Sequence, residues 1–349
     1  MIGKLGLIFY LFVFTSNACC QSSAVDRYAL RSVLFYNVEN LFDTINDPIT
    51  LDEAYTPDGR YNWTAKRYFH KLNRIARTIT EFSIQGRIMA PDIIGLCEVE
   101  NRSVLEDLVN NPKMVKYGYG IIQKDSPDAR GIDVALIYKK SAFQPTSFQH
   151  HELYLYNEVN ERQYTRDQLV VGGLLDNEGI YIIVNHWPSR RGGQQRSNAF
   201  RIEAARLNLK IIDSIRKVNW NPRILILGDF NDNPQDDSIK KNLKSVGNPD
   251  NSNHMTLFNP METMYDKGLG SLAYRDQWSL FDQILITMNM VFPEKGKYQF
   301  WKAGIDYREY LVTSEGRYKG YPFRTYAGGQ YTGGYSDHFP VYVLLIRKL

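Results

Sequence analysis

The chain has 349 residues and a formal charge of +4, from 42 lysines and arginines against 38 aspartates and glutamates. Hydrophobic residues make up 43% and charged residues 23%, as in ordinary soluble globular proteins. These values exclude a disordered chain, a collagen-like fibre and a protein with many membrane spans. The net charge is too small to identify a nucleic-acid partner by itself.

The first twenty residues have the pattern of an export signal. Lys4 precedes an almost wholly apolar run over residues 5–14, and small and polar residues follow. The run is about half the length that spans a bilayer, so it is too short for a transmembrane helix. We therefore predict a signal peptide over residues 1–18 and an exported protein.

Two cysteines follow directly on this segment and leave the mature N-terminus open. Cleavage before Cys19 would make it the new N-terminus, as in bacterial lipoproteins, whose cysteine is lipidated, although Ser16 stands where those signals usually have a larger aliphatic residue. A membrane-anchored lipoprotein is thus one prediction, and a plain secreted or periplasmic protein is the other. Cys97 has no cysteine partner in the folded part, which indicates a fold without disulfides and a small buried side chain at that position.

The remaining chain shows no repeat and no break in composition, so we predict one folded domain over residues 28–349. Short apolar runs typical of buried strands recur along it, at residues 31–38, 92–99, 132–138, 168–175, 180–186, 223–229, 281–287 and 341–346. Between them, apolar residues at steps of three and four predict one helix over 65–82 and another that begins at a Ser197 cap and ends near Val218. Strands that alternate with fewer helices indicate an α/β or α+β protein with a layered core.

Three long stretches read as irregular, at residues 43–63, 247–279 and 304–335. The third one interleaves tyrosines with arginines and a lysine. Such a stretch suits base stacking or phosphate contact, but it suits equally well the packing of a glycine-rich loop on the domain.

Polar groups stand repeatedly where an apolar strand begins or ends. The six positions are Asn37, Glu98, His186, Asp229, Asp282 and His338. Each has an ordinary interpretation as a turn, a cap or a solvated edge. Because a buried, unpaired charge is costly, six such ends are more easily explained if they surround one cation and one anionic substrate.

The residue types indicate the chemistry of such a site. Asn37 and Glu98 offer the hard oxygen ligands that Mg²⁺ or Mn²⁺ prefers. Asp229 and Asn231 lie two residues apart and would share one face of an extended segment, where they could hold an attacking water and a phosphate oxygen. Asp282 could orient His338 and raise its basicity. The sequence has neither a glycine-rich nucleotide loop nor a GxSxG motif, which disfavours ATP use and serine esterase chemistry.

Taken in order, these motifs resemble the endonuclease/exonuclease/phosphatase superfamily, the metal-dependent phosphodiesterases related to pancreatic deoxyribonuclease and the abasic-site endonucleases. The motifs that carry the resemblance are Tyr36-Asn37-Val38, Leu96-Cys97-Glu98, Asn185-His186-Trp187-Pro188, Gly228-Asp229-Phe230-Asn231, Phe281-Asp282-Gln283-Ile284 and Ser336-Asp337-His338-Phe339-Pro340. The segments 35–42 and 186–193 look like the exported, nuclease-like bacterial branch. The resemblance implies a four-layer α/β sandwich of two mixed β-sheets packed face to face, with helices on both outer faces.

It also implies roles for individual residues. Asn37 and Glu98 match the metal-binding positions, and Asp337 often assists there. Asp229 and Asn231 match the pair that positions water and phosphate, and His338 matches the histidine that contacts the scissile phosphate or acts as base, with Asp282 as its partner. His186 matches a second histidine that assists the leaving oxygen. Whether Asp229 or His338 takes the proton of the water stays open.

The sequence departs from the family in Gln283, where an aromatic residue is common, and in the absence of the disulfide of the pancreatic enzyme. Arg190 and Arg191 lie just after His186, where they could grip a flanking phosphate or form a solvated turn. The leading hypothesis is an exported, Mg²⁺- or Mn²⁺-dependent phosphodiesterase that acts on nucleic acid. The alternative is a lipid- or inositol-phosphate-directed hydrolase, and a surface-binding protein without activity is a third. No protein partner is implied.

Overall fold

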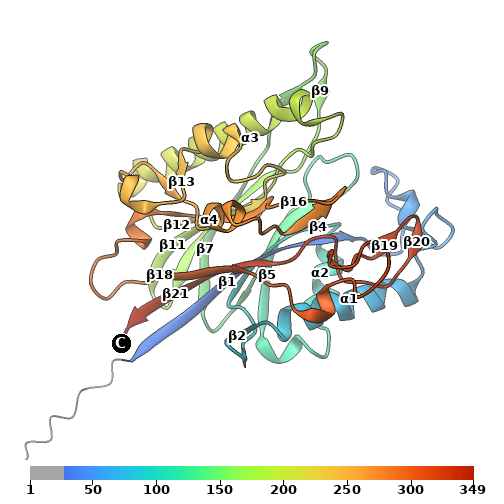
Figure 1. Cartoon of the computed structure of the whole chain (residues 1–349), viewed down its shortest axis with the longest axis horizontal. Coiled ribbons are helices and arrows are strands. Elements are labelled where there is room, and N and C mark those ends of the chain that lie inside the picture. The colour runs from blue at the N-terminus through green and yellow to red at the C-terminus, as the bar shows by residue number, and fades with distance from the viewer. Residues whose placement is uncertain (1–26) are drawn as a thin grey trace, which may run out of the picture.

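A computed structural model describes residues 27–349, and the predicted signal peptide and Cys19 lie outside the described residues. Two large mixed sheets form the centre of the molecule (Figure 1). In spatial order the six-stranded sheet contains β18 (Gln299–Ile305), β21 (Val341–Lys348), β1 (Tyr28–Leu41), β4 (Ile93–Val99), β6 (Asp133–Lys139) and β5 (Tyr119–Gln123). The seven-stranded sheet contains β13 (Ser245–Val246), β14 (Leu257–Phe258), β17 (Asp282–Thr287), β12 (Ile224–Asp229), β11 (Glu178–His186), β10 (Gln168–Leu175) and β7 (Phe143–His151).

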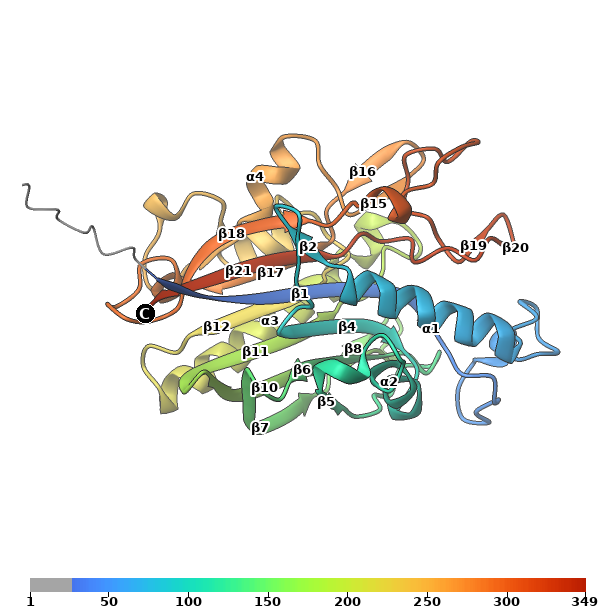
Figure 2. The ribbon, with the colours of Figure 1, turned by 90° about the horizontal axis from the view of Figure 1, so that it is seen from below.

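Helices cover the outer faces of both sheets, with α1 and α2 on one side and α3 on the other (Figures 1 and 2). The helices are α1 (Ala65–Thr80), α2 (Arg102–Val109), α3 (Gln194–Val218) and the short α4 (Met261–Asp266). Small hairpins decorate this body: β2 (Ser83–Ile84) with β3 (Arg87–Ile88), β8 (Leu155–Tyr156) with β9 (Arg162–Gln163), β15 (Leu272–Tyr274) with β16 (Gln277–Ser279), and β19 (Tyr326–Ala327) with β20 (Gln330–Tyr331). The four-layer sandwich predicted from the resemblance is confirmed.

The alternation of side chains along β1 shows how the layers are held together. Val33 and Phe35 are buried in the core between the sheets, whereas Leu34, Tyr36 and Val38 are buried against α1. Successive side chains of a strand point to opposite faces, so a strand that is apolar at every position is covered on both faces. The unbroken apolar runs of the sequence therefore correspond to strands at the centre of a layered fold.

The eight predicted strands are all present, with boundaries that differ by a few residues at most. The prediction of a Ser197 cap is wrong, because α3 begins three residues earlier, at Gln194. Gly192 and Gly193 have φ angles of 80° and 102°, a conformation that only glycine adopts easily, and they turn the chain into the helix. Ser197 lies inside the first turn, where its hydroxyl donates to the Gly193 carbonyl at 2.8 Å.

The stretch at 247–279 is less irregular than predicted, since it contains β14, α4 and the β15–β16 hairpin. Cys97 is a free cysteine, fully buried in the core between the sheets, as predicted. Within residues 27–349, no helix combines the length and the apolar character needed to cross a bilayer.

Candidate active site

Three adjacent strands of the seven-stranded sheet bring three of the predicted residues side by side. β11 and β12 run parallel with His186 opposite Asp229, and β12 and β17 run antiparallel with Asp229 opposite Asp282. The order of the side chains across the sheet is thus fixed by backbone pairing, and each stands at the end of a buried strand. The prediction that strand ends gather these groups holds for this sheet.

The six-stranded sheet supplies the other half of the site. Asn37 pairs with Cys97 where β1 and β4 run parallel, and Glu98 follows directly. The ladder is irregular here, and Glu98 has a φ angle of 61°. A left-handed non-glycine residue stores backbone strain and is found mostly where function requires it. His338 enters from the segment before β21, where its backbone N–H donates to the Ser336 hydroxyl.

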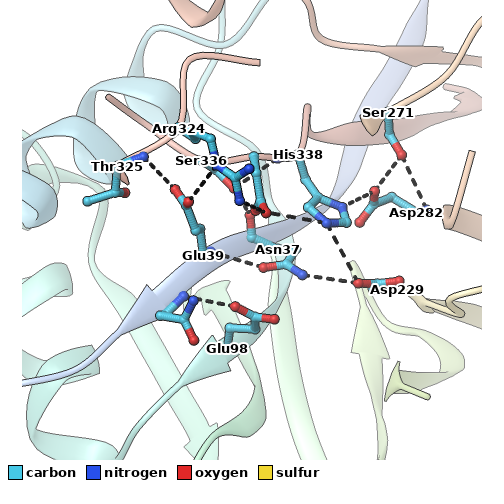
Figure 3. Close-up of polar contacts among 12 residues, drawn as sticks. Asn37, Glu39, Glu98, Asp229, Ser271, Asp282, Arg324, Thr325, Ser336 and His338 are labelled. Carbon is cyan, nitrogen blue, oxygen red and sulfur yellow. Dashed lines mark hydrogen bonds and ion pairs between the residues drawn. The ribbon is translucent and has the colours of Figure 1, made fainter. Parts of the chain in front are cut away.

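Asp229 connects the two sheets (Figure 3). The Asn37 amide donates to one of its carboxylate oxygens at 3.0 Å, and the Asn231 backbone N–H donates to the other at 2.9 Å. Burial raises the pKa of Asp229 to about 6, against the opposing charge of His338. At pH 7 this carboxyl is therefore ionised but more basic than an ordinary aspartate, as suits a group that accepts a proton.

His338 is held by carboxylates on several sides. Its Nδ1 lies 2.6 Å from an Asp282 oxygen, and its Nε2 lies 4.0 Å from Asp229 and 3.9 Å from Asp337. Burial by itself would lower the pKa of His338, but the charge and hydrogen bond of Asp282 outweigh it, and the pKa is raised well above its usual range. His338 is therefore a cation at neutral pH, and its Nε2–H faces the site.

His186 has the opposite electrostatic character. Its Nε2 lies 3.7 Å from Asp229 and 3.9 Å from Glu98, and its Nδ1 has no hydrogen-bond partner. Burial, followed by the charge of Arg166, lowers the pKa of His186 well below its usual range. The ring is therefore neutral at pH 7 and can donate one N–H without carrying charge.

The donor set fits a hard divalent cation. Asp229 is buried and Glu98 is mostly buried, and among the described residues their partners within ion-pair distance are the two histidines, of which His186 is neutral. No lysine or arginine of the described residues lies beside either carboxylate. A buried carboxylate without a positively charged partner is unfavourable, and a bound metal ion would supply the missing positive charge. Glu98 retains a carboxylate oxygen without a hydrogen bond, because its other oxygen accepts from the Asn40 backbone N–H at 2.9 Å.

The structure gives two of the predicted metal residues other contacts. Asn37 uses its amide oxygen to accept from the Glu39 backbone N–H and its amide N–H to hold Asp229, so its contacts orient the carboxylate of Asp229. Asp337 accepts from Arg324 at 2.8 Å. Glu98 is thus the predicted ligand whose geometry leaves it freest to bind an ion.

Arg190 does not have the role proposed for it from the sequence. Its guanidinium pairs with Asp232 and Asp236 and donates to the Asn231 carbonyl at 2.8 Å. A guanidinium held in this way is not free to bind a flanking phosphate, but it does fix the backbone of Asn231, whose side chain donates to the Trp187 carbonyl. Arg191 is exposed, and its contact with phosphate stays a prediction.

Two residues that sequence reasoning missed organise the rim of the site. Glu39, with a φ angle of 52°, accepts from the Thr325 backbone N–H at 2.6 Å and from Arg324 at 3.3 Å. Lys71 of α1 is fully buried, lies 3.7 Å from Glu39 and donates to Thr325 and to the Tyr335 carbonyl. Together they tie the loop before His338 to the body. The signal was present in the sequence, because Lys71 falls on the apolar stripe of its helix.

Replacing Lys71 by methionine is expected to lower the free energy of unfolding by about 3 kcal/mol, because it leaves the buried Glu39 carboxylate with the partly exposed Arg324 as its remaining cation. The change also removes the donor to Thr325 and Tyr335. Urea denaturation at pH 7 measures the change in the free energy of unfolding. The double variant Lys71→Met/Glu39→Gln is the matched control and should recover part of the loss. A loss below about 1 kcal/mol in the single variant would contradict the structural role.

The comparisons with known proteins agree with this geometry. The family model of the endonuclease/exonuclease/phosphatase family matches residues 32–347, nearly all of the described chain. The chain belongs to the endonuclease/exonuclease/phosphatase family. No curated protein matches it in sequence.

Several solved structures share the fold of this endonuclease/exonuclease/phosphatase family member. A family protein from Bacteroides thetaiotaomicron has 16% identity and a TM-score of 0.54, with 93% of this chain and 98% of that chain covered. A mannosyl-6-phosphatase from the same organism has 16% identity and a TM-score of 0.52, with 90% and 99% covered. D. rerio TDP2 in complex with a single-strand DNA product has 14% identity and a TM-score of 0.54, with 91% and 99% covered. At these identities the matches show the shared fold, and membership of the family identifies the chain as a phosphoesterase whose relatives typically use a divalent metal.

In this phosphoesterase we expect Asp282→Asn to change the pH profile. The Asp282 charge holds the pKa of His338 high, so the variant should lose the protonated form at lower pH. If protonated His338 is required, activity falls as pH rises through this pKa, and the fall should shift to lower pH by about 1–3 units. The pH dependence of kcat measures the shift. Ser271→Ala, which removes a hydrogen bond to Asp282 but leaves its charge, should shift the profile much less, and equal profiles for all three proteins would contradict the assignment.

Proposed function

We propose that the protein is an exported, divalent-metal-dependent phosphodiesterase that hydrolyses the backbone of nucleic acids. The observation that carries the proposal is the arrangement in Figure 3, in which the Asp229 carboxylate, a histidine held by Asp282 and the Glu98 carboxylate meet where the two sheets open. This is the arrangement that in-line attack on a phosphoester requires: a base, a cation for the phosphate and a metal-binding carboxylate.

The residues divide the work of hydrolysis by their charge states. Glu98, with Asn37 beside it, would hold the metal ion, which supplies neutralisation of phosphate charge when bound. Asp229, fixed from both sides by Asn37 and Asn231, accepts the proton of the attacking water. Protonated His338 donates to a phosphate oxygen and stabilises the charge that develops there. Neutral His186 donates an N–H hydrogen bond to the leaving oxygen, which takes its proton from solvent water.

The rim favours nucleic acid over a small phosphoester. The loop over residues 304–335 carries tyrosines and arginines, and Arg324 from this loop reaches Asp337, the neighbour of His338. Rings alternating with cations match alternating bases and phosphates. This composition also supports placing the protein in the nuclease-like branch of the family.

A second candidate function, hydrolysis of a phospholipid, is favoured by a different observation. The loop after β1 exposes Ile45, Ile49 and Leu51, at 74%, 89% and 67% of their surface. It begins beside the site, since Asp43 N–H donates to Glu100, two residues after Glu98. Exposed aliphatic side chains on a loop are typical of contact with an apolar surface.

A substrate panel tests the proposal. The purified protein is incubated with plasmid DNA, an RNA oligonucleotide, sphingomyelin vesicles, a small phosphodiester and mannose 6-phosphate, each with Mg²⁺, Mn²⁺ or chelator. We expect metal-dependent cleavage of a nucleic acid, and loss of that cleavage in His338→Ala. Cleavage that persists in chelator overturns the metal assignment. Turnover of vesicles or mannose 6-phosphate without cleavage of either nucleic acid overturns the substrate assignment.

We further propose that the protein is exported through its N-terminal segment and, in one form, attached to a membrane through lipidated Cys19. Expression of the full chain and of Cys19→Ala in a bacterium, followed by fractionation, tests this. Attachment predicts that the parent is found with membranes and the variant in the soluble exported fraction. Retention of both in the cytoplasm contradicts export.

A further inference from the structure

Two pockets adjoin Arg324, in the rim to which the loop over residues 304–335 contributes. One, of about 260 Å³, is lined by Arg60 and the rings of Tyr55, Tyr61 and Tyr326. The other, of about 380 Å³, is lined by Arg275, Arg317 and the rings of Tyr274, Tyr318 and Tyr321. Arg324 and Gly328 line both pockets, so the two are neighbours that share a wall.

Arg324 places this shared wall next to the proposed catalytic groups. Its guanidinium donates to Asp337 at 2.8 Å and to Glu39 at 3.3 Å. Figure 3 shows Arg324 beside Glu39. Asp337 precedes His338, whose ring faces Asp229 at 4.0 Å. A phosphate bound at His338 would therefore lie near the wall that the two pockets share.

The pockets hold cations that the protein itself does not neutralise. Arg60 lies over the ring of Tyr61, Arg275 over Tyr274 and Arg317 over Tyr318, at 5.8, 5.2 and 5.8 Å from the ring centroids. Over residues 27–349, none of these three arginines has a carboxylate within ion-pair distance. Each pocket thus pairs an available guanidinium with an aromatic face.

The acidic residues of the pockets are already engaged. Glu39 accepts from Arg324 and Thr325, and Asp276 accepts from the Tyr321 hydroxyl. They therefore take part in holding the rim, and the arginines remain as the groups that can bind a ligand. A ligand that fits has flat rings and negative charges in alternation.

We infer that the two pockets are subsites for nucleotides next to the scissile phosphate, and that the substrate is single-stranded. The inference rests on the proposed nuclease function and adds the form of the substrate. A base can stack on a tyrosine only if its face is exposed, and a duplex covers both faces of each base within its own stack. Arg60 and Arg317 then contact the flanking phosphates, one in each pocket.

The test compares single-stranded and duplex DNA of the same sequence. Binding of labelled oligonucleotides to the full chain is followed by fluorescence anisotropy in chelator, so that cleavage does not interfere. We expect Arg60→Ala and Arg317→Ala each to weaken single-strand binding about fivefold or more, and the double variant to lose about the product of the two. The slope of log affinity against log salt should fall by ~0.7 for each arginine removed. Arg206→Ala, an exposed arginine on α3, is the matched control and should bind as the parent does.

Two variants of Tyr318 test the contribution of the aromatic rings to binding. Tyr318→Phe keeps the ring and should bind like the parent, whereas Tyr318→Leu should bind about tenfold more weakly. Hydrolysis of a small phosphodiester, which reaches neither pocket, should be unchanged in all these variants, which shows that they fold and keep the reacting groups intact. If an alanine variant has a lower melting temperature than the parent, the arginine is replaced by glutamine instead.

The outcomes separate the two proposals. Duplex binding as tight as single-strand binding, or arginine variants that bind like the parent, overturns the subsite inference and leaves the nuclease function standing. A parent protein that turns over the small phosphodiester but neither binds nor cleaves nucleic acid overturns the nuclease function itself.

Discussion

Replacing Asp229 by asparagine lowers kcat by about 10³-fold, because the variant keeps the shape of the side chain but cannot accept the proton of the attacking water. The amide has the same shape but only one accepting oxygen, so it keeps the hydrogen bond from either the Asn37 amide or the Asn231 backbone N–H and loses the other, while the shape of the substrate site changes little. Single-turnover cleavage at saturating metal measures the loss. Activity within about tenfold of the parent would show that the proton of the water goes to another acceptor.

The stability of the same variant is its control, because the loss of one hydrogen bond is offset by the removal of a buried charge. Burial raises the pKa of Asp229 in the folded protein to about 6, above its usual value, so the folded state binds this proton more tightly than the unfolded state does. Its contribution to stability is therefore present at low pH and is lost as pH rises through about 6. In chelator at pH 8, Asp229→Asn should unfold at the same urea concentration as the parent or at a higher one. A clear loss at pH 8 would indicate a structural rather than a chemical defect.

Replacing Glu98 by glutamine lowers kcat/KM by about 10³-fold at low metal concentration, because the site loses the carboxylate that is freest to bind an ion. Raising the metal concentration should recover part of the activity, which distinguishes this variant from Asp229→Asn. Calorimetric titration of Mg²⁺ or Mn²⁺ into the protein measures the loss of affinity directly.

Glu100→Gln is the matched control for that titration. Glu100 lies two residues further along, is also buried and accepts from the Asp43 backbone N–H, and burial raises its pKa to about 8. It is therefore largely neutral at pH 7, and its replacement should leave metal affinity unchanged. Equal losses in the two variants would show that general charge near the site, and not a ligand, sets the affinity.

The strands that sequence reasoning identified and those that it missed differ in their place in the sheets. The eight predicted strands lie inside the sheets, where both faces and both edges are covered, and their residues are apolar almost throughout. The longer strands that were missed, β5, β7 and β18, all lie at a sheet edge. An edge strand carries polar residues and turn formers that blunt further pairing, as Pro145 does in β7, and it therefore loses the apolar signature.

The site could be predicted in its parts but not in its connections. Asn37, Glu98, Asp229 and His338 were recognisable because each interrupts an apolar strand in a motif of the family. The contacts of Arg190 with Asp232 and Asp236 span more than 40 positions, and a local pattern contains no information on such a pair. Lys71 and Glu39 could have been suspected individually, since each puts a charge where the pattern is apolar, but only the fold shows that they meet.

The pairing of the first strand with the last has a consequence for where the enzyme works. Tyr28 lies opposite Lys348, so the chain enters β1 and leaves β21 at the same end of the sandwich, as Figure 1 shows. Asn37 is nine residues further along β1, about 30 Å away at the rise of a strand. A lipid on Cys19, as proposed above, would be joined to the domain at this end, away from Asn37 and the other site residues. This arrangement favours hydrolysis of dissolved polymers over hydrolysis of the lipids of the bilayer to which the protein is attached.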